Sequence, residues 1–340
     1  EFGNRYIAGT FQNSITLGPF SATLGSGLTG IFVAKQNFSG HWEYLANNTP
    51  ISYSNIYDMD LSQDGEIVIT GRVSTLNYGT VYFGPNASIT GKGANAFGAM
   101  IDNSGSWLWA KKLGSSSHEL GRGASLIHNS TDNSTIFYSD LCSSSTSPRT
   151  CSLNVMKIDN SGTDYGSVSI FSGLGSNPYA SSLLIDGHND IYLSGTISSS
   201  NQVSCGSTGI TTTYGSEVFL AKIDVSWKTQ QTNTATYTCE WVELSQSSPA
   251  NSISNLVYSN AGELVLDEYG NIMMLGSTSA NMTFSGHFFS GDYPSYSQFL
   301  MKFYSNGTSH SDSLNLTAGD GSKIRLNGLI YNGSGKFVIS

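Results

Sequence analysis

The chain is poor in charged residues. Only 11% of its 340 residues are Asp, Glu, Lys or Arg, against the roughly 25% usual in globular proteins. The net charge is −9, and the largest basic cluster is the pair Lys111-Lys112. Nucleic-acid binding needs a basic surface for the phosphates, so we expect no nucleic-acid partner. Few ionisable groups also mean little pH-linked loss of stability, which suits an exposed, extracellular surface.

Long apolar runs and helical periodicity are also missing. No apolar segment approaches the ~20 residues of a membrane-spanning helix, so we expect this segment not to span a membrane. No stretch of ten residues has the 3.6-residue period of an amphipathic helix. The chain starts at Glu1 without a signal-peptide pattern, which we interpret as a segment cut from a longer chain.

The usual catalytic and metal-binding motifs are absent. The six His are scattered, the four Cys form no CxxC, and neither HExxH nor a G-x-S-x-G elbow occurs. DNSGSW (102–107) lacks the spacing of the sialidase turn, and a glycosidase also needs two placed carboxylates. We therefore predict no catalytic residue, no metal site, no cofactor and no enzymatic activity.

Two acidic segments are weighed as calcium loops. Asp58, Asp60 and Asp64 in DMDLSQDG have a faint resemblance to such a loop, but strand alternation followed by a turn Asp is the favoured interpretation. Asp186, Asn189 and Asp190 in IDGHND are interpreted in the same way.

A repeated motif, called here the opening motif, is the main feature that the sequence does contain. It occurs five times, as IFVAKQN (31–37), AFGAMID (96–102), LNVMKID (153–159), VFLAKID (218–224) and QFLMKFY (298–304). Before it come a hairpin of two apolar strands with an Asp/Asn/Gly turn, as in LLIDGHNDIYLSG, and a short motif such as VYFG. After it comes an aromatic strand such as SWLWAKKLG.

The spacing of these motifs is regular. From the residue before the Gly of the short motif to the Lys or Met of the opening motif, the gaps are 18, 17, 17 and 18 residues. A period of about 65 residues, with four to five short antiparallel strands per unit, predicts an all-β fold and a β-propeller. The expected modules are 10–71, 72–140, 141–195, 196–276 and 277–340, with 1–9 as an extra repeat strand of a single propeller.

Segments such as DIYLSG…VSCG…VFLAKID and FGAMIDNSGSWLWAKKLG resemble the SBBP-type β-propeller repeat family of bacterial and archaeal surface or secreted proteins. Units of that family are similar to NIYVTG…TFG…DIFVAKLD…GNWLWAK. The resemblance covers nearly the whole chain, although the third module lacks the TFG element. It implies a propeller in a cell-surface or secreted setting, and it implies no chemistry.

The cysteines predict two disulfides, since an even number in such a chain fits an oxidising compartment. Cys142 and Cys151 flank a short loop in the third module, and a Cys205–Cys239 bridge would pin an insert near 228–238. Four buried free thiols are the alternative.

Two further sets of residues are candidates for modification and binding. Nine N-x-S/T sequons are candidate glycosylation sites: Asn37, Asn47, Asn86, Asn129, Asn133, Asn281, Asn306, Asn315 and Asn332. Six tyrosines are candidates for sugar stacking, although strand packing is the commoner role of such residues: Tyr53, Tyr57, Tyr78, Tyr82, Tyr293 and Tyr296.

These features predict a non-enzymatic extracellular or cell-surface protein, a structural or adhesive module whose partners are a glycan, a surface protein or its own neighbouring subunit. A secreted glycan-active enzyme with an axial pocket is one alternative. A filament subunit is another, because NRYIAG and KFVIS, at the two ends of the chain, are the same strand of the repeat.

Overall fold

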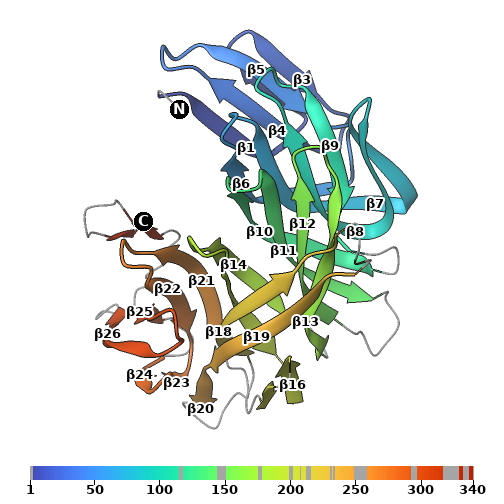
Figure 1. Ribbon diagram of the computed structural model, residues 1–340. Helices are drawn as coiled ribbons and strands as arrows, with labels where there is room; N and C mark the ends of the chain where they lie inside the picture. The colour runs from blue at the N-terminus through green and yellow to red at the C-terminus, as the bar shows by residue number, and fades with distance from the viewer. Residues whose placement is uncertain are drawn as a thin grey trace. The chain divides into compact units, whose positions relative to one another are not determined.

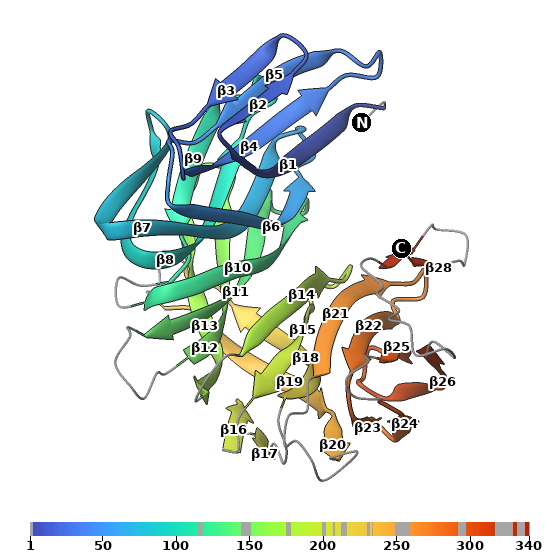
Figure 2. The ribbon, with the colours of Figure 1, turned by 180° about the vertical axis from the view of Figure 1, so that it is seen from behind.

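The computed structural model describes residues 3–114, 118–143, 151–174, 178–198, 202–206, 208–211, 216–229, 232, 234–248, 259–291, 297–316, 329–331 and 337–339. These residues form 28 strands and no helix (Figures 1 and 2). The protein is therefore all-β, as the sequence predicts.

The chain divides into two compact units. Unit 1 contains residues 1–149, 154–167 and 227–235, and unit 2 contains residues 150–153, 168–226 and 236–340. Each unit is described by itself below.

Unit 1 begins with a sheet of three strands, in the order β1 (Arg5–Gln12), β4 (Thr29–Gln36) and β5 (Trp42–Asn47), with a separate hairpin of β2 (Ser14–Leu17) and β3 (Phe20–Thr23). The next four strands pair in chain order: β6 (Tyr53–Leu61), β7 (Ile67–Gly84), β8 (Ala87–Ile101) and β9 (Trp107–Lys112). The short motif VYFG lies at the end of the long strand β7, which pairs with the long strand β8. The hairpin that carries this motif is therefore continuous with the sheet.

Four more strands continue this sheet: β10 (His118–Asn129), β11 (Ser134–Ser143), β12 (Cys151–Asp159) and β13 (Asp164–Leu174). A single parallel pair, Leu120 with Ala94, joins β10 to β8. Otherwise β10 lies against β6 and β7.

Unit 2 contains two further sheets of four strands in chain order. The first consists of β14 (Tyr179–Ile185), β15 (Ile191–Ser198), β18 (Ser216–Ser226) and β19 (Thr236–Leu244), and the second of β21 (Ser259–Leu266), β22 (Ile272–Thr278), β25 (Ser297–Phe303) and β26 (Ser309–Leu316). The remaining strands pair as β16 (Gln202–Cys205) with β17 (Thr208–Thr211), as β20 (Gln246–Ser248) with β23 (Asn281–Phe284) and β24 (His287–Phe289), and as β27 (Leu329–Tyr331) with β28 (Phe337–Ile339).

The same Gly–Phe contact recurs in four of the sheets. In these sheets, the Gly that follows the second apolar strand of the hairpin, as in DIYLSG, lies opposite the Phe of the opening motif. The pairs are Gly9–Phe32, Gly71–Phe97, Gly195–Phe219 and Gly276–Phe299. A Cβ on any of these glycines would lie 2.2–3.0 Å from a ring atom of its Phe, closer than van der Waals contact permits. The repeat therefore needs Gly there, because an aromatic ring covers that backbone.

In two of these sheets, the Phe of the short motif packs against the Phe of the opening motif. Phe83 and Phe284 are buried, and their rings lie 5.4 Å and 6.3 Å from those of Phe97 and Phe299. In module four, Cys205 takes the equivalent position and is also buried. Burial of these rings with aliphatic residues of neighbouring strands forms the core of each unit.

The first strand of each group of four strands also makes polar contacts with the first strand of the next group. In unit 1, Asp58 on β6 accepts a hydrogen bond from the Leu126 amide of β10, at 3.0 Å. In unit 2, the Ser182 hydroxyl accepts one from the Leu264 amide at 3.1 Å, and Glu263 accepts one from the Leu329 amide at 2.8 Å. Each contact follows a bulge in the accepting strand, which turns the side chain out of the usual alternation.

Candidate functional site

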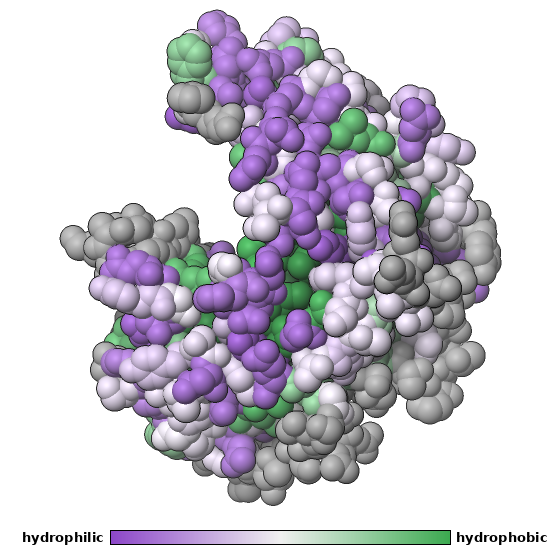
Figure 3. Space-filling view, viewed as in Figure 1, coloured by the Kyte–Doolittle hydropathy of each residue, from purple (hydrophilic) through white to green (hydrophobic). Residues whose placement is uncertain are grey.

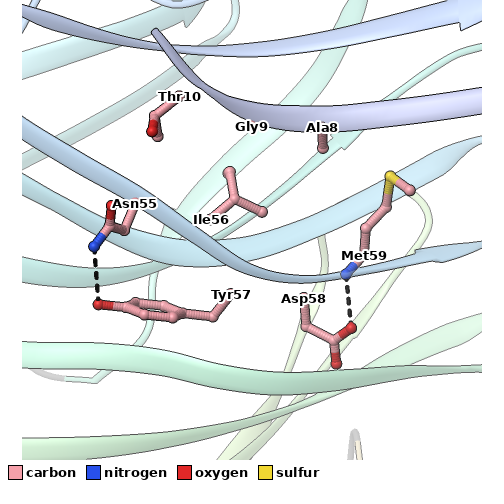
Figure 4. Close-up of a pocket in the computed structure, with 8 residues that line it drawn as sticks. All are labelled: Ala8, Gly9, Thr10, Asn55, Ile56, Tyr57, Asp58 and Met59. Carbon is pink, nitrogen blue, oxygen red and sulfur yellow. Dashed lines mark hydrogen bonds between the residues drawn. The ribbon is translucent and has the colours of Figure 1, made fainter. Parts of the chain in front are cut away.

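A pocket of about 370 Å³ lies between β1 and β6 in unit 1. Figure 4 shows its walls: β1 contributes Ala8, Gly9 and Thr10, and β6 contributes the five residues Asn55 to Met59. Ile56 points toward β1 in this view, while the Asp58 carboxyl points away from it. The pocket is therefore lined by small, apolar and amide or hydroxyl side chains, with no free carboxylate aimed into it.

Three residues of β6 form what we call the tyrosine row: Tyr53, Asn55 and Tyr57. Alternation places Tyr53 and Asn55 on one side of the strand, and the bulge at Tyr57 still leaves its hydroxyl within reach of Asn55. The Asn55 Nδ2 donates hydrogen bonds to the hydroxyl oxygens of Tyr53, at 2.6 Å, and Tyr57, at 3.4 Å. The two tyrosines remain 42% and 38% exposed, so their positions are set by the amide while their ring surface stays accessible.

Two arginines stand beside the row. Arg72 on β7 is the cross-strand partner of Asn55, and its guanidinium lies 5.6 Å from the centre of the Tyr53 ring. Arg122 on β10 lies 5.4 Å from the centre of the Tyr57 ring. Both distances are within the range of a cation–π contact, so each of the two tyrosine rings interacts with one arginine.

The acidic residues of β6 hold the strand in place. The Asp58 Oδ2 accepts hydrogen bonds from the Ser125 hydroxyl, at 2.9 Å, and the Leu126 amide, and the Asp60 Oδ2 accepts one from the His128 amide at 2.8 Å. Burial raises the pKa of Asp58 above its ordinary value, and the hydrogen bonds from Leu126, Met59 and Ser125 oppose that rise. Asp58 and Asp60 are thus strand residues that bind β10.

The pocket lining contains a single carboxyl group. Asp58 is the only acidic residue among the eight that line the pocket, and β10 already uses its carboxyl. Glycoside hydrolysis needs two facing carboxyl groups, which this pocket does not provide. Tyrosine faces, hydroxyl groups, an amide and guanidinium groups are instead the groups that recognise sugars and other polar ligands.

The surface around the site is polar. On the face shown in Figure 3, the part carrying β1 to β9 is mostly hydrophilic or intermediate in hydropathy. Such a surface fits a hydroxyl-rich ligand better than an apolar one.

The structure places some of the predicted sugar-stacking tyrosines together. Tyr53 and Tyr57 share the row, and Tyr82 is exposed on β7. The side chain of Tyr78, and the residues Tyr293 and Tyr296, lie outside the described part. Asn55, Arg72 and Arg122 were not predicted from the sequence. Alternation in YSNIY could have identified Asn55, whereas the arginines depend on strand register and packing.

The cysteines are oxidised. Cys205 and Cys239 form a disulfide with a Cα–Cα distance of 5.6 Å, which ties β16 to β19. Cys142 and Cys151 are also disulfide-bonded, so none of the four is a free thiol.

The sequons occupy varied positions. Asn47, Asn86, Asn133 and Asn306 are exposed, Asn37, Asn129, Asn281 and Asn315 are half-buried, and Asn332 lies outside the described residues. At Asn37 the side-chain oxygen accepts hydrogen bonds from two backbone amides of its own turn. Glycosylation stays a prediction at all nine.

Within the described residues, no three His, Cys, Asp or Glu side chains converge as metal ligands would. The same residues contain no helix that could cross a membrane.

Comparison with known proteins gives limited information. No protein-family model matches the chain, and no curated protein matches it. One solved structure that it matches is the extracellular domain of a putative one-component system from B. thetaiotaomicron, with 13% identity and a TM-score of 0.31. The match covers 96% of this chain and 40% of that one, so the chain spans less than half of its length.

Proposed function

We propose that this chain is part of an extracellular β-propeller with SBBP-type repeats, a non-enzymatic module that binds glycans through the tyrosine row and the pocket beside it. Sheets of four antiparallel strands in chain order, whose first strand lies against the neighbouring sheet, support a propeller. The oxidised cysteines support an oxidising, extracellular compartment.

The exposed tyrosine row carries the functional part of the proposal. An exposed aromatic ring keeps apolar surface in contact with water, which is unfavourable. The apolar face of a sugar ring can stack on that surface and remove it from water. The Asn55 amide holds both hydroxyl groups, so little side-chain freedom is lost when a ligand binds. Asn55 Oδ1 accepts no hydrogen bond from any residue that the structure describes and is available to a sugar hydroxyl.

A screen on immobilised oligosaccharides of plant, animal and microbial type tests the proposal. The wild-type chain should bind a subset, and the double variant Tyr53→Ala/Tyr57→Ala should bind that subset at least about tenfold more weakly. Tyr269→Ala is the matched control, because Tyr269 is 79% exposed at a turn of unit 2. Equal binding by the double variant and the wild type, with both folded by circular dichroism, would refute this role of the row.

A further inference from the structure

Arg72 carries a positive charge with no ion-pair or hydrogen-bond partner among the residues that the structure describes. Its Nε atom is buried and makes no hydrogen bond, and none of the ion pairs in the described part of the chain includes it. Within the described part of the chain, its guanidinium contacts the Tyr53 ring and makes no polar interaction. Such a group loses solvation on burial and regains little of it from an aromatic ring.

Arg122 provides an internal comparison. It occupies the corresponding place over Tyr57, but its Nε donates a hydrogen bond to Asp140 at 2.9 Å. Acidic residues outnumber basic ones in this chain, 24 to 15, so an acidic partner for Arg72 would not be scarce. The nearby carboxyl on β6, Asp58, is directed to β10 instead. The charge at Arg72 is therefore left for something outside the protein.

We infer that the ligand of the tyrosine row is an acidic oligosaccharide, whose anionic group binds the Arg72 guanidinium while a sugar ring covers the exposed tyrosine surface. The planar guanidinium fork matches a carboxylate with two parallel hydrogen bonds. Asn55, directly opposite Arg72 in the strand register, places a free amide oxygen beside that anion site for a neighbouring hydroxyl. The inference rests on the proposed function and specifies its ligand class.

The test uses matched ligands that differ only in charge. Oligogalacturonide is compared with its methyl ester, and a sulfated dextran oligosaccharide with unsulfated dextran, so that a carboxylate and a sulfate are distinguished. The wild type should bind at least one acidic member about tenfold or more tightly than its neutral counterpart, since charge-assisted hydrogen bonds are about twice as strong as neutral ones. This preference should decline between about 50 and about 300 mM salt.

Variants assign the preference to Arg72. Arg72→Gln should bring the ratio of affinities for an acidic ligand and its uncharged counterpart close to one, whereas Arg72→Lys should keep part of the preference because the charge remains without the fork. Arg5→Gln is the control, since Arg5 is an exposed arginine of the same unit and the change in net charge is the same.

The possible results separate the two proposals. If the wild type binds neutral and acidic partners equally, or Arg72→Gln retains the preference, the inference is wrong while glycan binding by the tyrosine row stands. If neither these ligands nor the wider oligosaccharide panel bind, the proposed function is wrong as well. Melting temperatures of the variants within a few degrees of the wild type exclude unfolding as the cause of lost binding.

Discussion

Cross-strand pairs explain individual residues of the repeat. The Lys of the opening motif lies over a Tyr of the neighbouring strand in two sheets: Lys35 is 5.8 Å from the ring centre of Tyr6, and Lys222 is 5.8 Å from that of Tyr192. Lys222 also pairs with Asp190 and Glu240, at 2.8 and 2.9 Å. In module two the same pair of positions is Met100 and Val68. In the sheet of β21 to β26 the pair is Lys302 and Met273, so the Lys is present in three of these four sheets and the aromatic partner in two.

The Gly–Phe pair makes a prediction at the residue scale. Gly195→Ala would place a Cβ 2.4 Å from the Tyr179 carbonyl oxygen and 2.7 Å from the Phe219 ring. We expect the free energy of unfolding to fall by about 1–3 kcal/mol or more, because strand and ring must move apart. Guanidinium denaturation measures the change.

The control for this substitution is Gly187→Ala. Gly187 lies in the turn between β14 and β15, and a Cβ there would meet no atom within 4 Å. Its stability should stay within about 0.5 kcal/mol of the wild type. If Gly195→Ala is equally harmless, close ring packing is not the reason for Gly at this position.

At the scale of elements, each four-stranded sheet has a hairpin between its second and third strands. In module two this hairpin is held by the continuous strands β7 and β8, and in module five β23 also pairs with β20. In module four, β16 and β17 pair with each other and form a separate sheet. The disulfide from Cys205 to Cys239 supplies the tie to β19 that strand pairing does not.

The disulfide therefore predicts a local dependence on oxidation. Cys205→Ser/Cys239→Ser should lower the free energy of unfolding by about 2–4 kcal/mol, because a bridge across 34 residues restricts the unfolded chain. Thermal unfolding with and without reductant measures this loss, and added reductant should lower the melting temperature of the double variant less than that of the wild type. An unchanged midpoint in the double variant would show that the hairpin is held by packing alone.

At the scale of the whole molecule, few charges set the response to pH. Burial acts to raise the pKa values of the Asp102, Asp159 and Asp267 carboxyl groups. Hydrogen bonds outweigh this effect and lower each pKa below the ordinary 3.8: Ser104 donates to Asp102, Ser161 to Asp159 and Lys302 to Asp267. A carboxyl group whose pKa is lower in the folded state stabilises the folded protein at pH values above its ordinary pKa. This contribution is lost as the pH falls through the pKa of the folded state. At Lys222, burial acts to lower the pKa, but the hydrogen bonds that its ammonium group donates to Asp190 and Glu240 raise it, so its contribution is lost only at strongly alkaline pH.

The melting temperature should thus be nearly constant from about pH 5 to about pH 9 and should fall below about pH 4. Calorimetry in a buffer series of constant ionic strength tests this profile. Asp267→Asn should be less stable than the wild type at neutral pH and should approach it in acid. A steady decline from pH 9 to pH 5 would mean that other groups, such as the six His, dominate the response.

The sequence by itself determined the all-β class, the order of the strand motifs and the tyrosines of β6, because period-2 alternation and turn residues act over a few neighbouring positions. Even Asn55 could be placed in the tyrosine row from that alternation. Only the tertiary structure decided that Arg72 stands opposite Asn55 and that Arg122 covers Tyr57. Strand register and the packing of β10 on β6 join residues 17 to 65 positions apart, and no local pattern reports contacts over that distance.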